Sequence, residues 1–146
     1  MTVLRQLLLI AACLPAAVAA EDRCPWLNAA TAGGVLGGAV HATVTSTSCE
    51  FVHQSGANQS LRIEVVQASG AHPKCGSGAV PLKAIGNEAQ ACPYTGDPGV
   101  IAEQVVGRVR DQAFLVRVST TDRSAPPKNL REKARIIAEQ VAGILF

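Results

Sequence analysis

Residues 101–120, IAEQVVGRVRDQAFLVRVST, contain the clearest strand pair in the chain. Apolar and polar side chains alternate on both sides of Asp111-Gln112, and a period of two is typical of strands with one buried face. The pattern predicts a hairpin with Asp111-Gln112 at its tip. One face is expected to carry Val105, Gly107, Val109, Phe114, Val116 and Val118, and the other Val106, Arg108, Arg110, Leu115 and Arg117.

Two helices are predicted, one on either side of the strand-forming residues. Asn28 can cap a short helix over 29–36, which Gly37 can end. Pro127 suits the first turn of a second, longer helix, because its missing N–H group has no partner there. Helical spacing then gives this helix one apolar stripe to pack on the sheet: Leu130, Ala134, Ile137, Ala138, Val141 and Leu145.

The remaining strands precede the C-terminal hairpin. Alternation predicts a hairpin of strands over 40–45 and 49–53, then a third strand over 61–65. Glycines and prolines make 69–81 a long loop, and a short strand is expected over 88–92. The sequence therefore predicts an α+β fold, a twisted antiparallel sheet of five to six strands with both helices packed on one face.

The N-terminal segment has the pattern of a secretory signal. Arg5 is its lone positive charge, an apolar run covers residues 7–13, and small residues precede a cut after Ala20. The predicted mature protein is a single domain over 21–146, secreted or periplasmic. The apolar run is too short to cross a membrane as a helix, and no second run follows.

A lipid anchor at Cys13 is the alternative for this segment. Residues 10–13, Ile-Ala-Ala-Cys, have the form of a lipobox whose cysteine would be acylated. The apolar run before Cys13 is short for that role, and small residues continue past it. We therefore favour cleavage near Ala20.

Four cysteines remain after cleavage, Cys24, Cys49, Cys75 and Cys92. An even number in an exported chain indicates two disulfides, whereas zinc sites favour closely spaced ligand pairs that this chain lacks. The first hairpin register places Val44 opposite Cys49 and turns Cys49 toward the short helix, close to Cys24. This geometry favours pairing Cys24 with Cys49, and Cys75 with Cys92.

Composition narrows the classes of partner. The 146 residues carry 13 basic and 11 acidic side chains with no basic run, so neither nucleic acid nor an anionic membrane surface is an expected partner. One tryptophan, one tyrosine and three phenylalanines offer little for stacking on bases or sugars. No long apolar segment and no cofactor motif is present beyond the signal.

The histidines, Ser77 and Glu88 are the candidates for metal binding or catalysis. The register puts His41 and His53 on opposite faces, and His72 lies in a remote loop, so a shared metal site is not expected. Ser77 lacks the spacing of a nucleophile elbow, and its glycine-rich surroundings lack the ending of a phosphate loop. Glu88, after Gly86-Asn87, is the one acidic candidate, although a turn is the favoured interpretation there.

Several short motifs together resemble a known family. They are Cys24-Pro-Trp-Leu-Asn, Val35-Leu36-Gly37-Gly38, Cys49 at a strand start and Ile85-Gly86-Asn87-Glu88-Ala89, followed by the valine-rich hairpin and closing helix. This order resembles small secreted domains common among actinobacterial lipoproteins. The resemblance covers nearly all of 24–146 and implies an α+β sandwich related to the PsbP and Mog1 superfamily. Cys75 and Cys92 depart from that pattern, and no catalytic residue carries over.

The leading hypothesis is a non-enzymatic exported domain that binds a ligand or an envelope protein, or gives structural support. Its partner surface is predicted on the solvent face of the last hairpin, where Arg108, Arg110 and Arg117 alternate with Val106 and Leu115. Guanidinium groups among exposed aliphatics are typical of interface centres. The alternative is a small secreted hydrolase whose site assembles only in three dimensions.

The even cysteine count makes a direct prediction. The mature protein, unfolded without reductant, should show no thiol that reacts with a maleimide, because all four cysteines are oxidised. Two or more reactive thiols would contradict this and reopen the metal-site interpretation.

Overall fold

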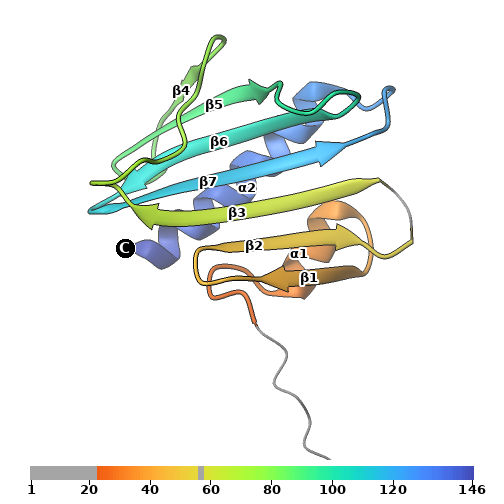
Figure 1. Cartoon of the computed structure of the whole chain (residues 1–146), viewed down its shortest axis with the longest axis horizontal. Helices are drawn as coiled ribbons and strands as arrows, with labels where there is room; N and C mark the ends of the chain where they lie inside the picture. Colours follow the sequence, from red (N-terminus) through yellow and green to blue (C-terminus); the bar gives the residue numbers. More distant parts are fainter. Residues whose placement is uncertain (1–22, 56–57) are drawn as a thin grey trace, which may run out of the picture.

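The computed structural model describes residues 23–55 and 58–146; the predicted signal and Cys13 lie outside them. Two helices and seven strands follow one another along the chain (Figure 1). They are α1 (Ala29–Leu36), β1 (Val40–Val44), β2 (Ser48–His53), β3 (Gln59–Gln67), β4 (Val80–Leu82), β5 (Glu88–Tyr94), β6 (Ile101–Val109), β7 (Gln112–Thr120) and α2 (Pro127–Leu145).

The strands form one antiparallel sheet in the order β1-β2-β3-β7-β6-β5-β4. The α+β class is confirmed, but the predicted count of five to six strands was too low. The additional strand is β4. Its first two residues, Val80 and Pro81, fall within the loop predicted over 69–81. Three residues with a central proline, Val80-Pro81-Leu82, are too few to show a period, and pairing with β5 defines the strand.

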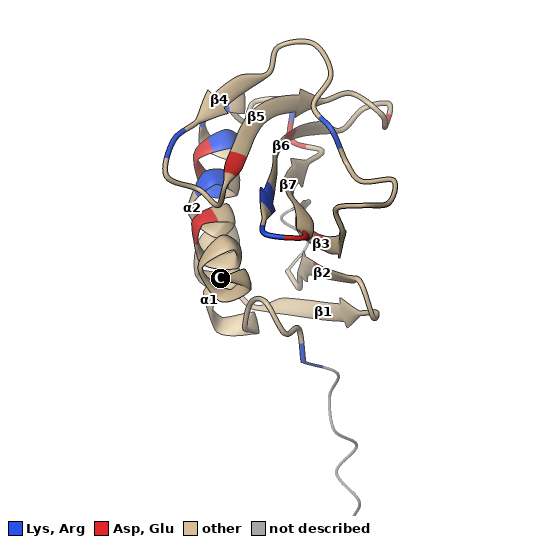
Figure 2. Ribbon diagram, turned by 90° about the vertical axis from the view of Figure 1, so that its left-hand side faces the viewer, with Lys and Arg blue, Asp and Glu red and all other residues tan. Residues whose placement is uncertain are grey.

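Both helices cover the same face of the sheet (Figure 2). Helix α1 packs on β1 to β3 and α2 on β5 to β7. The predicted stripe of α2 is buried from Leu130 to Val141, and Leu145 is partly buried against the core. Phe51 and Phe114 are the largest side chains fully enclosed between the layers.

The N-terminal half forms as its local sequence predicts. The Asn28 carboxamide oxygen accepts a hydrogen bond from the Thr31 N–H at 2.8 Å, and Gly37 ends α1 with φ 87°. Val44 lies opposite Cys49, which is bridged to Cys24. The first disulfide therefore ties the chain before α1 to the helix-covered side of β2.

The C-terminal hairpin keeps the predicted faces, but its tip is Arg110-Asp111 instead of Asp111-Gln112. Arg110 adopts φ 54° in this turn. A Cβ on Gly107 would lie 2.5 Å from Cζ of Phe114, its cross-strand neighbour. Glycine at this position therefore makes room for the aromatic ring in the core.

Two adjacent isoleucines of α2 test this packing. Ile137 is fully buried, whereas Ile136 is 37% exposed. Ile137→Asp should lower the free energy of unfolding by about 3–5 kcal/mol, because it buries a carboxylate without a partner. Ile136→Asp should change it by no more than about 0.5 kcal/mol. Urea unfolding of both variants measures the difference, and equal midpoints would show that α2 is not docked through Ile137.

Candidate functional site

The face of the sheet opposite the helices is partly covered by the chain itself. We call residues 68–79, which join β3 to β4, the crossover segment. It starts at the Ala68 N–H, which donates to the Asp111 carbonyl at 2.7 Å, and it runs across β7, β6 and β5 to the far edge (Figures 1 and 2). The Cys75–Cys92 disulfide, paired as predicted, fixes it to β5.

This covering corrects the predicted partner surface. Leu115 is only 3% exposed and Val106 only 7%, so neither aliphatic side chain is offered to a partner. Alternation placed them correctly on the face opposite the helices. It could not show that a distant segment returns over that face, because burial there depends on the sheet order.

The three arginines of the predicted surface do not form one stripe. Arg110 is in the hairpin turn, where its backbone N–H donates to the Asn87 carboxamide oxygen at 2.6 Å. Arg108 forms an ion pair with Glu88 at 3.2 Å. Arg117 lies near the middle of the sheet and is held by neighbouring side chains. Each arginine therefore has a separate environment.

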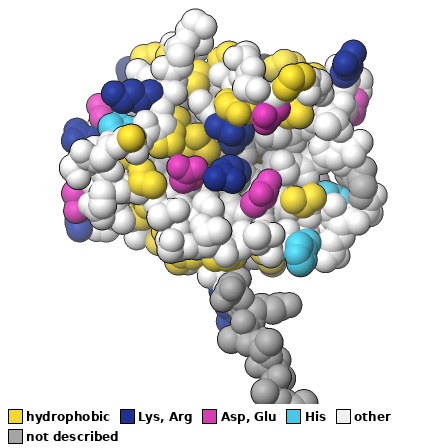
Figure 3. All heavy atoms as spheres, viewed as in Figure 1, with side chains coloured by type: hydrophobic (Ala, Val, Ile, Leu, Met, Phe, Trp, Pro, Cys, Tyr) yellow, Lys and Arg dark blue, Asp and Glu magenta, His cyan; other side chains and the backbone are white. Residues whose placement is uncertain are grey.

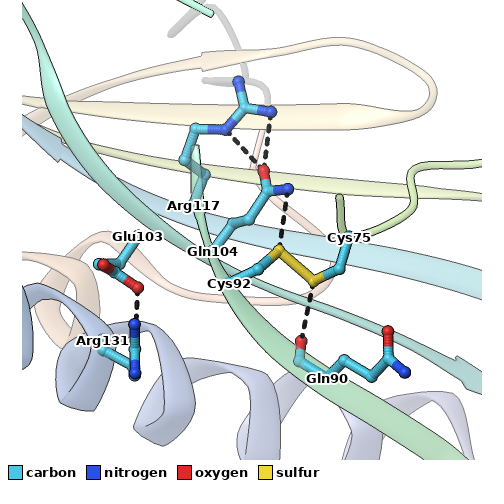
Figure 4. The surroundings of a disulfide bond; sticks show 7 residues. All are labelled: Cys75, Gln90, Cys92, Glu103, Gln104, Arg117 and Arg131. Carbon is cyan, nitrogen blue, oxygen red and sulfur yellow. Dashed lines mark hydrogen bonds and ion pairs between the residues drawn. A yellow bond between two sulfur atoms is a disulfide. The ribbon is translucent and has the colours of Figure 1, made fainter. Parts of the chain in front are cut away.

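Arg117 belongs to a polar row that crosses the sheet. Its guanidinium lies 3.4 Å from the centre of the Tyr94 ring, and its Nε and Nη2 donate to Gln104 Oε1 at 3.1 and 3.0 Å. Gln104 Nε2 in turn donates to Cys92 Sγ at 3.5 Å (Figure 4). Burial lowers the pKa of Arg117. This row of contacts connects Arg117 to the Cys75–Cys92 disulfide, and its role is to hold these side chains in place.

A second arginine in the middle of this face is also paired. Arg62, directly opposite Arg117 on β3, forms an ion pair with Glu64 at 3.3 Å. Basic and acidic side chains consequently lie together in the middle of the face (Figure 3). On the helix side, the buried Glu103 carboxylate accepts from Arg131 of α2 at 2.8 Å.

A pocket of about 550 Å³ lies between the crossover segment and the strands β4 to β6. Its apolar lining comes from Pro73, Pro81, Leu82, Ala89 and Val106, and its polar lining includes His72, Lys74, Asn87, Glu88, Gln90 and Arg108. Val106 is buried and on the same face of the sheet as Arg108, whereas Lys74, Glu88 and Arg108 are exposed. The pocket thus has an apolar floor and a charged rim, a combination common in small-molecule sites.

The sequence identified only part of this pocket. The sequence predicts Glu88 as the acidic candidate and Arg108 as a contact residue, and both line the pocket. His72, predicted to be remote from carboxylates, lines the same pocket as Glu88, and its Nδ1 lies 3.1 Å from the Gly70 carbonyl oxygen. Lys74 was missed because irregular chain has no period. Its proximity to Cys75 was the available signal, since that bridge places it over β5.

The histidines do not come together with other metal-ligand side chains in the described part of the chain. Within residues 23–55 and 58–146, no three His, Cys, Asp or Glu side chains come together in a group that could hold an ion. His41 and His53 lie on opposite faces of the first hairpin, as the register predicted.

Comparisons with known proteins assign neither a family nor a function to this chain. No family model, no curated protein and no solved structure matches the chain.

The Cys75–Cys92 bridge provides a test of how the pocket is held together. A Cys75→Ala/Cys92→Ala variant should free the crossover segment and expose the bond after Lys74 to trypsin. Loss of a bridge spanning 17 residues should also cost about 3 kcal/mol of stability. The matched control is Cys24→Ala/Cys49→Ala, which leaves that segment fixed. Equal rates of cleavage at Lys74 in the two variants, measured by mass spectrometry under folded conditions, would contradict this role.

Proposed function

We propose that this protein is an exported binding domain that holds a small amphipathic anion in the pocket beneath the crossover segment. The observation that carries the proposal is the apolar floor at Val106 and Pro81, on the face of the sheet that also carries Arg108, together with two cationic side chains, Lys74 and Arg108. Glu88 is the only acid in the lining, so the pocket carries net positive charge. An apolar body would displace water from the floor, while a carboxylate, sulfonate or phosphate would accept from Arg108 and Lys74.

The lining residues support binding more than hydrolysis. None of them carries a hydroxyl group, and the one sulfur, that of Cys75, is in a disulfide. Glu88 is the only carboxylate, whereas acid–base hydrolysis of glycosides uses a pair. The lining of this pocket therefore offers neither a hydroxyl or thiol nucleophile nor a pair of carboxylates to support the alternative, a small secreted hydrolase.

Export and family membership belong to the same proposal. Support for export comes from the signal-like pattern of residues 1–20 and from two disulfides, which are typical of oxidising compartments. Neither α1 nor α2, the helices of the described residues, has the length and apolar character needed to cross a membrane. A relationship to the PsbP and Mog1 superfamily rests on the short motifs around Cys24, Gly37 and Glu88.

Two dyes that differ in charge can test the pocket directly. The anionic 8-anilinonaphthalene-1-sulfonate should bind saturably with enhanced fluorescence, and the neutral N-phenyl-1-naphthylamine should bind through its apolar body alone. Arg108→Gln should weaken binding of the anionic dye about tenfold, equivalent to ~1.4 kcal/mol. The same substitution should leave the neutral dye unaffected, because only the sulfonate meets the guanidinium.

Arg110→Gln is the matched control. Arg110 is an exposed arginine two residues away that does not line the pocket, so its variant should bind both dyes like the wild type. Equal losses in the two arginine variants, or no saturable binding by the folded wild type, would overturn the proposal.

A further inference from the structure

The outer edge of β1 carries unpaired main-chain groups. The Thr45 N–H donates to the Ser48 carbonyl at 2.8 Å, and the Gln54 N–H donates to the Ala39 carbonyl at 2.9 Å. Main-chain groups alternate in direction along an antiparallel strand, so those of Val40, Ala42 and Val44 point away from β2. Within the described residues, no backbone hydrogen bond reaches them from another segment.

The two edges of the sheet differ in how they are protected. The opposite edge, β4, is only three residues long and contains Pro81, which cannot donate a hydrogen bond. Strand β1 has five residues, VHATV, with no proline, lysine or other charged side chain. It is therefore the edge that can accept another strand.

A groove of about 720 Å³ runs beside β1, between this edge and residues 23–29. Leu27 and Phe51 contribute apolar surface to it. The side chains of Val40, Ala42 and Val44 are on the helix side of the sheet, and those of His41 and Thr43 are on the other side. In an added antiparallel strand, residues opposite Val40, Ala42 and Val44 would face the same side as the groove.

We infer that a second copy of this chain occupies the edge, with the two β1 strands antiparallel about a two-fold axis at Ala42. The outward-facing main-chain N–H and C=O groups of Val40, Ala42 and Val44 in one β1 can then hydrogen-bond to the same groups of the other β1. Val40 of one copy lies opposite Val44 of the second, so apolar residues meet in the groove. His41 lies opposite Thr43 of the second copy, with no like charges in contact. This isologous pairing joins the two sheets into one and does not depend on the ligand pocket.

The register allows a charge-swap experiment at exposed positions. His41 and Thr43 are exposed, so replacing both changes the contact without entering the core. Wild-type protein should show a concentration-dependent monomer–dimer equilibrium by sedimentation. His41→Lys/Thr43→Lys and His41→Glu/Thr43→Glu should each be monomeric, because the two-fold register opposes like charges. Their mixture should form a heterodimer, detected by native mass spectrometry.

A control substitution on β2 and two contrary results complete the test of this dimer. Val52→Lys places a lysine on β2, at a position 45% exposed and one strand in from the edge, and should leave the dimer intact. A wild type that stays monomeric at every concentration would overturn the inference. So would charge variants that each dimerise like the wild type.

Discussion

The pairing of β3 with β7 is the constraint on which the rest of the structure depends. Nine residues of each strand pair in register and join the first three strands to the C-terminal hairpin. Because β7 takes the free edge of β3, the chain leaving β3 has to reach the other side of β6 before it can pair again. The crossover segment, the covered open face and the pocket beside β5 all follow from that detour (Figure 1).

The same pairing places two arginines side by side. Arg62 and Arg117 are direct neighbours in the β3–β7 register, an arrangement that is unfavourable between unshielded like charges. Glu64 pairs with Arg62, while the Tyr94 ring and Gln104 hold Arg117. Each of these two cations therefore has its own partners, whereas Arg108 pairs with Glu88 at the rim of the pocket.

Local signals predicted much of the fold. The Asn28 cap, the Gly37 ending, the hairpin faces and the α2 stripe depend on residues close in sequence, and each formed as expected. The predictions that were wrong concern segments brought together from distant parts of the sequence. Strand β4 exists because β5 pairs with it, and Val106 and Leu115 are buried on the face that alternation assigned to solvent. Of the pocket, Arg108 is predicted because it lies on a patterned strand and Glu88 because it belongs to the motif Ile85-Gly86-Asn87-Glu88-Ala89, whereas Lys74 lies in irregular chain.

The order of the two disulfides along the chain has a consequence for oxidation. Cys24 pairs with Cys49 before Cys75 pairs with Cys92, so the two covalent loops neither interleave nor nest. In a chain exported as proposed above, N-terminus first and with its signal removed, Cys24 and Cys75 each meet their native partner as the next thiol to emerge. Sequential oxidation by thiol exchange then yields the native connectivity without reshuffling by an isomerase.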